Sequence, residues 1–132
     1  MKYLVDTNIC IYIIKKKPEV VIKRFTKMKP DSIGISVITL SELLYGVSKS
    51  SKPDENIIAL EQFILPLSVV NFTKEDAISY GKLRAKLEMN GNLIGAMDML
   101  IASQALSRGL ILVTNNEREF IKIEGLSIEN WI

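Results

Sequence analysis

Short apolar runs and longer amphipathic stretches alternate along the chain, which is the pattern of a parallel β-sheet flanked by helices. The apolar runs predict strands at residues 2–5, 33–38, 67–71 and 110–113, with a final strand near 126–131. Helical spacing predicts helices at residues 8–16, 19–28, 39–47, 56–65, 73–89 and 93–107. The sequence therefore predicts a single α/β domain over residues 1–132, with a central, mostly parallel sheet flanked by helices.

The first predicted strand ends on an acid, Asp6, which is followed by two good helix-capping residues, Thr7 and Asn8. In open α/β sheets, ligands bind just beyond the carboxyl ends of the strands. If Thr7 or Asn8 caps the next helix, Asp6 has no local role. We therefore expect the Asp6 carboxylate to face a functional crevice.

Asp98 lies inside the apolar stripe of the last predicted helix. At 100° per residue from Ile94, Asp98 falls at about 40° and Ile101 at about −20°. A carboxylate that faces a core costs several kcal/mol unless it is paired or binds a metal. A salt bridge to Arg84 or Arg108 is the structural alternative to a functional site.

Glu42 follows the strand predicted at residues 33–38 and so lies at the same sheet edge as Asp6. The spacing Thr39-x-x-Glu42 is also that of a capping box, in which the glutamate accepts a hydrogen bond from the Thr39 amide. Spacing alone leaves both interpretations open.

A fourth polar segment, from Thr114 to Glu119, follows the strand at 110–113. It offers a hydroxyl, amides and carboxylates, while Asn116-x-x-Glu119 has the spacing of a second capping box. Either Asn116 or Glu119 could complete a cluster with the other acids, and spacing does not choose between them.

The chain has no histidine, which excludes a Ser-His-Asp triad and histidine-based zinc sites. Converging carboxylates repel one another and partly protonate unless a cation joins them. Oxygen ligands without His or paired Cys favour Mg²⁺, or else Mn²⁺, over zinc. Such ions bind phosphate oxygens and activate water, which suits phosphodiester hydrolysis.

Charge is unevenly distributed, because residues 15–29 carry seven cations and one acid in a chain of net charge +2. This basic segment could supply phosphate contacts for a polyanion, or it could be an ordinary solvated helix face. No apolar run is long enough for a membrane span, and the N-terminus does not have the pattern of a signal peptide. The single cysteine, Cys10, has no intramolecular disulfide partner. We expect a soluble, cytoplasmic protein with no membrane association.

Four segments are similar in order and spacing to those of PIN-domain ribonucleases of the VapC toxin type: Leu4–Asn8, Ser41–Gly46, Ile94–Ala102 and Val113–Phe120. The resemblance spans nearly the whole chain, and the closing Trp131 also fits it. It implies Mg²⁺-dependent endonucleolytic cleavage of RNA, with transfer RNA as the expected substrate. It also implies a cognate VapB-type antitoxin and a homodimer.

The metal acids of the family correspond to Asp6, Glu42 and Asp98 in this sequence, with Thr114 and either Asn116 or Glu119 completing the site. Many PIN domains have an acid where Asn116 stands, so the chain departs from the family there.

Two other functions fit parts of the pattern. An aspartyl-phosphate phosphatase would use Asp6 as a covalent nucleophile, but such enzymes usually have a second aspartate two residues later, where this chain has Asn8. A non-catalytic RNA- or protein-binding module with a PIN-like fold is the other alternative.

Overall fold

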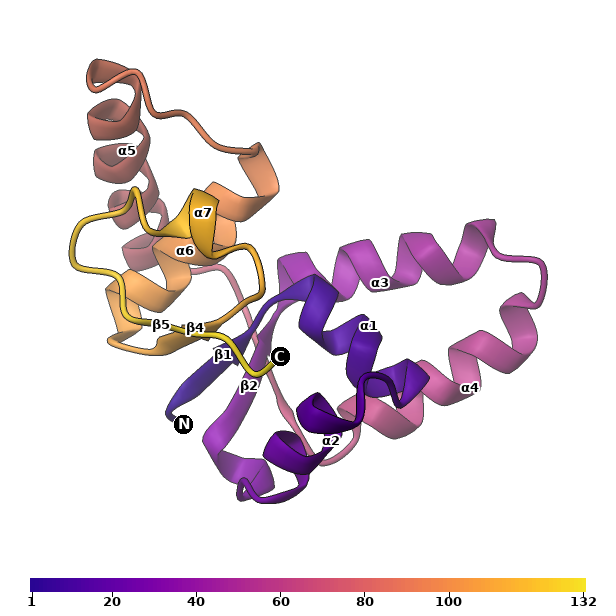
Figure 1. Cartoon of the computed structure of the whole chain (residues 1–132). Helices are drawn as coiled ribbons and strands as arrows, with labels where there is room; N and C mark the ends of the chain where they lie inside the picture. Colours follow the sequence, from indigo (N-terminus) through magenta and orange to yellow (C-terminus); the bar gives the residue numbers. More distant parts are fainter.

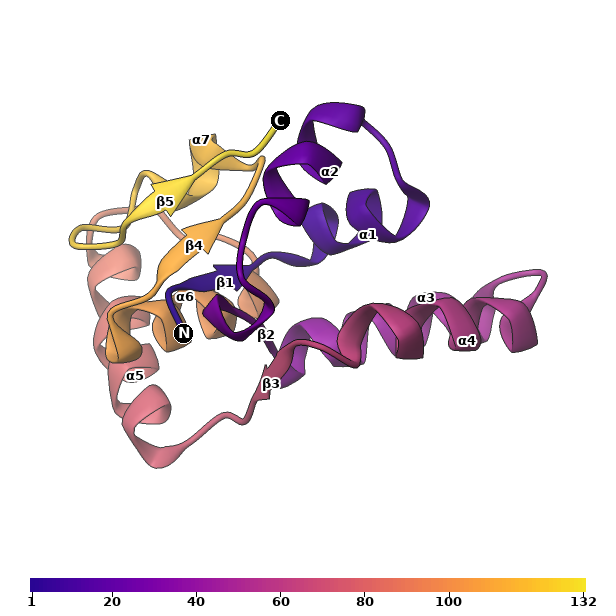
Figure 2. The same ribbon diagram turned by 90° about the horizontal axis from the view of Figure 1, so that it is seen from below.

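A five-stranded parallel sheet with strand order β3-β2-β1-β4-β5 forms the centre of the computed structural model, which describes residues 1–132 (Figures 1 and 2). The strands are β1 (Tyr3–Val5), β2 (Ile33–Ser36), β3 (Ser68–Val70), β4 (Ile111–Val113) and β5 (Ile128–Glu129). The helices are α1 (Thr7–Lys15), α2 (Glu19–Thr26), η1 (Pro30–Ser32, a 3₁₀ turn), α3 (Val37–Lys49), α4 (Pro53–Ile64), α5 (Lys74–Met89), α6 (Ala96–Arg108) and α7 (Glu117–Phe120). The predicted fold class is confirmed.

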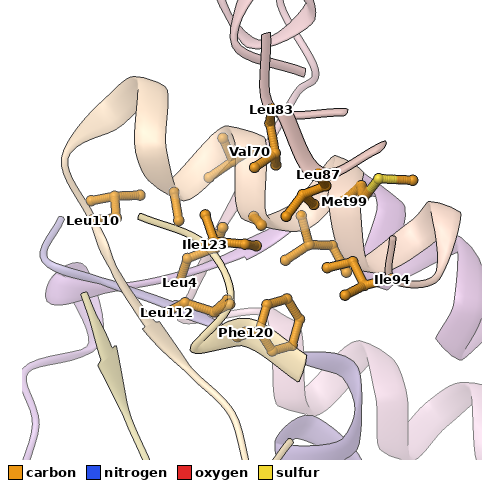
Figure 3. Close-up of a cluster of buried hydrophobic side chains, with 13 residues drawn as sticks. Leu4, Val70, Leu83, Leu87, Ile94, Met99, Leu110, Leu112, Phe120 and Ile123 are labelled. Carbon is orange, nitrogen blue, oxygen red and sulfur yellow. The ribbon is translucent and has the colours of Figure 1, made fainter. Parts of the chain in front are cut away.

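Apolar side chains cover both faces of the sheet, as a parallel sheet requires. Alternation along β1 sends Leu4 to one face, whereas Tyr3 and Val5 face the other. The Leu4 face packs against α5, α6 and α7, and Figure 3 shows Leu112 and Phe120 in this cluster. The opposite face packs against α1 to α4.

The strand register brings distant polar residues to one edge of the sheet. Val5 is paired with Val113, so Asp6 and Thr114 follow neighbouring strands at the same level. Leu4 is paired with Gly34, which places the end of β2 beside the end of β1. The starts of α1 and α3 therefore lie side by side at this edge (Figure 1).

Several predicted boundaries are wrong for identifiable reasons. The strand predicted at 33–38 ends at Ser36, because the Ser36 hydroxyl accepts a hydrogen bond from the Ile38 amide at 3.0 Å and starts α3. The β-branched residues after Ser36 favour a strand only locally. Helix α4 begins at Pro53, before the helix predicted at 56–65, because proline suits the first turn of a helix.

The C-terminal segment also differs from the prediction. Helix α6 begins at Ala96 rather than at residue 93, and the short helix α7 was not predicted. The final strand has only two residues, but the chain end is fixed by Trp131, which is 1% exposed and lies edge-on to Tyr3 with ring centroids 5.5 Å apart. No helix is both long enough and apolar enough to cross a lipid bilayer.

Candidate active site

Asp6 lies at the junction of β1 and α1 and is only 4% exposed. Its Oδ1 accepts a hydrogen bond from the Thr7 amide at 2.6 Å, and its Oδ2 accepts one from the Thr114 hydroxyl at 2.8 Å. Asp6 is therefore the N-cap of α1, so the expectation that Thr7 or Asn8 fills this role is wrong. Since the strand ends at Val5 and the helix starts at once, the acid itself occupies the capping position.

Glu42 is joined to the start of α1 by Thr7. The Thr7 hydroxyl donates to Glu42 Oε1 at 2.7 Å and lies 3.2 Å from the hydroxyl of Thr39, which is fully buried. The capping box proposed for Thr39 and Glu42 does not form, because α3 begins two residues earlier, with Ser36 as its cap. The Glu42 carboxylate is thus directed toward the edge that holds Asp6.

Asp98 lies in the first turn of α6 and is half-buried. The salt-bridge alternative is wrong, because Arg84 pairs with Glu88 at 3.3 Å and Arg108 pairs with Asp76 at 3.1 Å. Asp98 takes part in none of the ion pairs of the structure.

Burial, together with the negative charges of Asp6, Glu42 and Glu119, raises the pKa of Asp98 to about 6. Burial is also the main reason that the pKa of Asp6 lies above its usual value. The hydrogen bonds from Thr114 and Thr7 act in the opposite direction, and the charge of Glu42 raises the pKa further. Asp98 is therefore close enough to the other three acids to be affected by their charges, and Asp6 is close enough to Glu42.

Thr114 connects β4 to the acids. Its buried hydroxyl donates to Asp6 and accepts a hydrogen bond from the Asn116 amide at 3.0 Å. Asn116 precedes α7 but makes no side-chain cap, so the second predicted capping box is also absent. Glu119 Oε2 lies 3.4 Å from Lys122 Nζ, the only cation within ion-pairing distance of these acids.

Sequence reasoning missed two parts of this network. Thr7 was expected only as a helix cap, and Thr39 only as part of a capping box, whereas both lie between Asp6 and Glu42. Asn115, whose amide donates to the Tyr12 hydroxyl at 3.2 Å, was not singled out either. Apart from the Asp-Thr order after β1, the sequence contains no local signal for these contacts.

The arrangement offers oxygen donors and uncompensated negative charge, which are the features of a site for a hard divalent cation. No three acidic side chains form a ready-made cage around one point. Two features support a metal site here: the donors are all oxygen atoms, and the pKa values of Asp6 and Asp98 are raised, as expected for acids that lack a neutralising cation.

The basic segment meets the acids only at Lys15, which lines the same groove as Glu42. All seven of its cations are exposed, and two of them are already paired, Lys23 with Glu19 and Arg24 with Glu129. Helix α1 starts at the acids, and Lys15 is at its other end, about 12 Å away at 1.5 Å per residue. Phosphate binding by this segment remains a prediction.

The raised pKa of Asp98 predicts a pH-dependent stability in the absence of metal. Since the folded pKa of about 6 is above the usual 3.8, the contribution of this carboxyl is complete below about pH 4 and is lost as the pH rises through about 6. We expect Asp98→Asn to stabilise the metal-free chain by about 1–2 kcal/mol at pH 8, and by much less near pH 4.

Thermal unfolding in EDTA at several pH values measures this difference. Asp31→Asn, at an exposed position in η1, is the matched control and should leave the pH profile unchanged. If the difference in unfolding temperature between Asp98→Asn and the parent chain does not grow as the pH rises, the placement of Asp98 among other acids is contradicted.

The strand order, together with the acids at the carboxyl edge of the sheet, places the chain in a class of small parallel α/β proteins. In this class the functional site lies beyond the strand ends. The PIN domain family matches residues 3–126. The chain is 45% identical over 131 residues to the tRNA(fMet)-specific endonuclease VapC of Salmonella typhimurium, covering 99% of this chain and 98% of that protein.

Two crystal structures have similar folds. That of DNA-bound VapBC from Salmonella typhimurium gives a TM-score of 0.95 at 45% identity, covering 100% of this chain and 99% of the other. That of VapBC2 from Rickettsia felis, bound to a DNA fragment from the promoter, gives 0.94 at 42% identity, covering all of both chains. The chain belongs to the PIN domain family and, within it, to the VapC type, which confirms the resemblance found in the sequence.

Proposed function

We propose that this chain is the toxin of a VapBC-type toxin–antitoxin system and that it hydrolyses RNA with Mg²⁺, or Mn²⁺, as cofactor. The observation that carries the proposal is the group of acids at the sheet edge, in which Asp6 and Asp98 repel each other without a neutralising lysine or arginine. The VapC relatives named as ribonucleases and endonucleases support the same reaction.

We assign Asp6, Glu42 and Asp98 as the residues that would hold the ion. Glu119 is the better fourth carboxylate, because its charge raises the pKa of Asp98, whereas Asn116 contributes only its backbone amide to the network. When bound, a magnesium or manganese ion neutralises phosphate oxygens and lowers the pKa of a water molecule.

The residues around the acids have positioning roles. Thr114 and the Thr7 amide each bind one oxygen of Asp6 and fix the plane of its carboxylate. The Thr7 hydroxyl holds Glu42 in the same way. A phosphodiester at this edge would be attacked by water, with cleavage of the bond between phosphorus and the leaving oxygen. Glu42, which is less enclosed than Asp6, is suited to accept the proton of that water.

Transfer RNA is the proposed substrate, since the Salmonella relative is a tRNA(fMet)-specific endonuclease and the two chains match over nearly their whole length. A VapB-type antitoxin is the proposed partner. An apolar groove of about 360 Å³ between α1, α3 and α4, lined by residues such as Ile14, Val47 and Leu60, reaches Glu42. An antitoxin segment seated there would block the acids. The homodimer and the cytoplasmic location remain expectations.

The phosphatase alternative is disfavoured by the surroundings of Asp6. A covalent nucleophile needs an oxygen that is free to attack phosphorus, whereas both Asp6 oxygens accept hydrogen bonds and the residue is 4% exposed. A binding module without catalysis would retain affinity for RNA in EDTA and would leave that RNA intact in Mg²⁺.

Incubation of the purified chain with total RNA tests the proposal. We expect discrete transfer RNA fragments with Mg²⁺ or Mn²⁺, no fragments with EDTA, and restored cleavage when excess Mg²⁺ is added back. Addition of a cognate VapB-type antitoxin should stop cleavage. Fragments that persist in EDTA would contradict the metal assignment, and intact RNA in every metal would contradict the nuclease function.

A further inference from the structure

A second pocket, of about 240 Å³, lies between α5 and the segment that follows α7. Lys82 and Lys86, one turn apart on α5, and Lys122 from the other wall line it, and Ser79 and Asn90 add a hydroxyl and an amide. Figure 1 shows the chain after α7 turning toward α5 at this place. The function proposed above does not use this pocket, which we call the lysine pocket.

The lysine pocket begins one side chain away from the acids of the candidate active site. Lys122 lines the pocket, and its Nζ is 3.4 Å from Glu119 Oε2. Glu119 in turn is among the charges that raise the pKa of Asp98. A polyanion that reaches the acids can therefore continue into the lysine pocket without leaving the surface.

The pocket has an excess of positive charge. Lys82 forms no ion pair, and Lys86 pairs only with Glu124, whose side chain is 81% exposed. Such an exposed pair contributes little to stability and is easily exchanged for another anion. Glu124 also lines the cavity, so three ammonium groups stand against one carboxylate there. The remaining positive charge favours an anion with several oxygens.

We propose that the lysine pocket binds the phosphodiester backbone of the RNA substrate next to the cleaved bond. This inference rests on the proposed ribonuclease function. Lys82 and Lys86 each contact a phosphate oxygen, and Ser79 and Asn90 are neutral donors to the same strand. The apolar floor, which includes Leu83 and Leu87, can pack against a ribose. The contacts are independent of base sequence, so they position the strand rather than select it.

The double variant Lys82→Gln/Lys86→Gln tests the proposal, with RNA binding measured separately from cleavage. Binding of a fluorescent transfer RNA is measured in the Asp6→Asn background, where no cleavage is expected, at several salt concentrations. Loss of two phosphate contacts should lower the slope of log affinity against log salt by about 1.4, and should weaken binding about 5- to 25-fold at 0.1 M salt.

The matched control is Lys52→Gln/Lys74→Gln, which removes the same charge at two exposed positions outside the pocket. Lys122 is left unchanged because it also contacts Glu119. Both double variants should unfold at nearly the parent temperature, since exposed substitutions usually change stability by about 0.5 kcal/mol or less.

The outcomes separate the two proposals. A lower slope for the pocket variant alone, together with a raised KM in the cleaving chain, supports the pocket. Equal slopes for the two variants overturn it. The proposal is also overturned if the pocket variant binds RNA as tightly as the parent chain, even where inorganic phosphate binds the parent's pocket. It is overturned as well if the pocket variant loses affinity for the antitoxin but not for RNA. RNA that binds with the expected slope but is not cleaved overturns the nuclease function and supports the pocket.

Discussion

Asp6→Asn is expected to reduce RNA cleavage at least about 1000-fold while leaving the fold intact. The substitution retains the size of the side chain and an acceptor oxygen for the Thr7 amide, whereas the new NH2 group would donate to the Thr114 hydroxyl, which donates to Asp6 in the parent chain. It removes the negative charge that would hold the cation. Metal ions provide several kcal/mol of transition-state stabilisation, and each 1.36 kcal/mol corresponds to a factor of ten in rate.

The variant should fold because asparagine is as good an N-cap as aspartate. Burial without a cation raises the pKa of Asp6, so loss of this charge should not destabilise the metal-free chain. Initial rates on labelled transfer RNA, together with thermal unfolding of the same samples, measure the two effects separately. Asp31→Asn serves as the control for aspartate replacement, and it should cleave at the parent rate.

Two results would count against the assignment of Asp6. One is a rate within about tenfold of the parent chain, since a residue that binds the cation directly should have a larger effect. The other is a large loss of stability in EDTA, because it would mean that Asp6 acts mainly as the cap of α1. Asp6→Ala, which removes the cap as well as the charge, should lose both activity and about 1 kcal/mol of stability.

The fold could be predicted because the apolar period changes between strands and helices. Buried strands such as β1 and β4 read as uninterrupted apolar runs, which is typical of a parallel sheet covered on both faces. The boundaries were less predictable. The β-branched residues from Val37 to Thr39 fit a strand as well as a helix, and only the Ser36 cap decides between them. The two-residue strand β5 has too short a pattern to locate.

The acids of the site could be predicted from their position after buried strands, or inside an apolar stripe in the case of Asp98. Their partners could not, because they depend on the sheet register. Thr7 and Glu42 are 35 residues apart, and Asp6 and Thr114 are 108 residues apart. Local rules instead predicted capping boxes for Glu42 and Glu119, because the capping-box pattern ignores where a helix actually starts.

The lysine pocket shows the same limit. Lys82 and Lys86 belong to one face of α5, which the helical period makes visible in the sequence. Lys122 joins them only because the chain turns back after α7, a helix that the sequence pattern did not predict. The sequence instead shows most clearly the dense basic segment at 15–29, where positive charge is clustered along the chain.

Asp76→Ala is expected to destabilise the protein by about 2–4 kcal/mol without removing any residue of the candidate active site. The Asp76 side chain is fully buried and joins the start of α5 to the end of α6. It accepts hydrogen bonds from the Thr73 amide at 2.8 Å, from Arg108 at 3.1 Å and from the Ser107 hydroxyl. Alanine would leave these donors without an acceptor and would remove the Asp76 half of the capping box of α5, in which Thr73 is the N-cap.

The effect should depend on pH in the opposite sense to that of Asp98. Burial acts to raise the pKa of Asp76, but the hydrogen bonds from Ser107, Thr73 and Arg108 outweigh it, so the pKa lies below the usual 3.8. A lowered pKa means that the stabilisation is present above about pH 4 and is lost as the pH falls through the folded value. The difference between Asp76→Ala and the parent chain should therefore shrink on acidification.

Chemical denaturation at pH 7 and at pH 3 measures this difference, with Glu75→Ala, an exposed neighbour on α5, as the control. Since α6 also carries Asp98, loosening of its C-terminal end tests whether the site depends on the packing of α5 against α6. Cleavage at a temperature where the variant is still folded should be near the parent rate. A loss below about 1 kcal/mol, or a loss that grows at low pH, would show that the buried carboxylate is not the ionised centre of this contact.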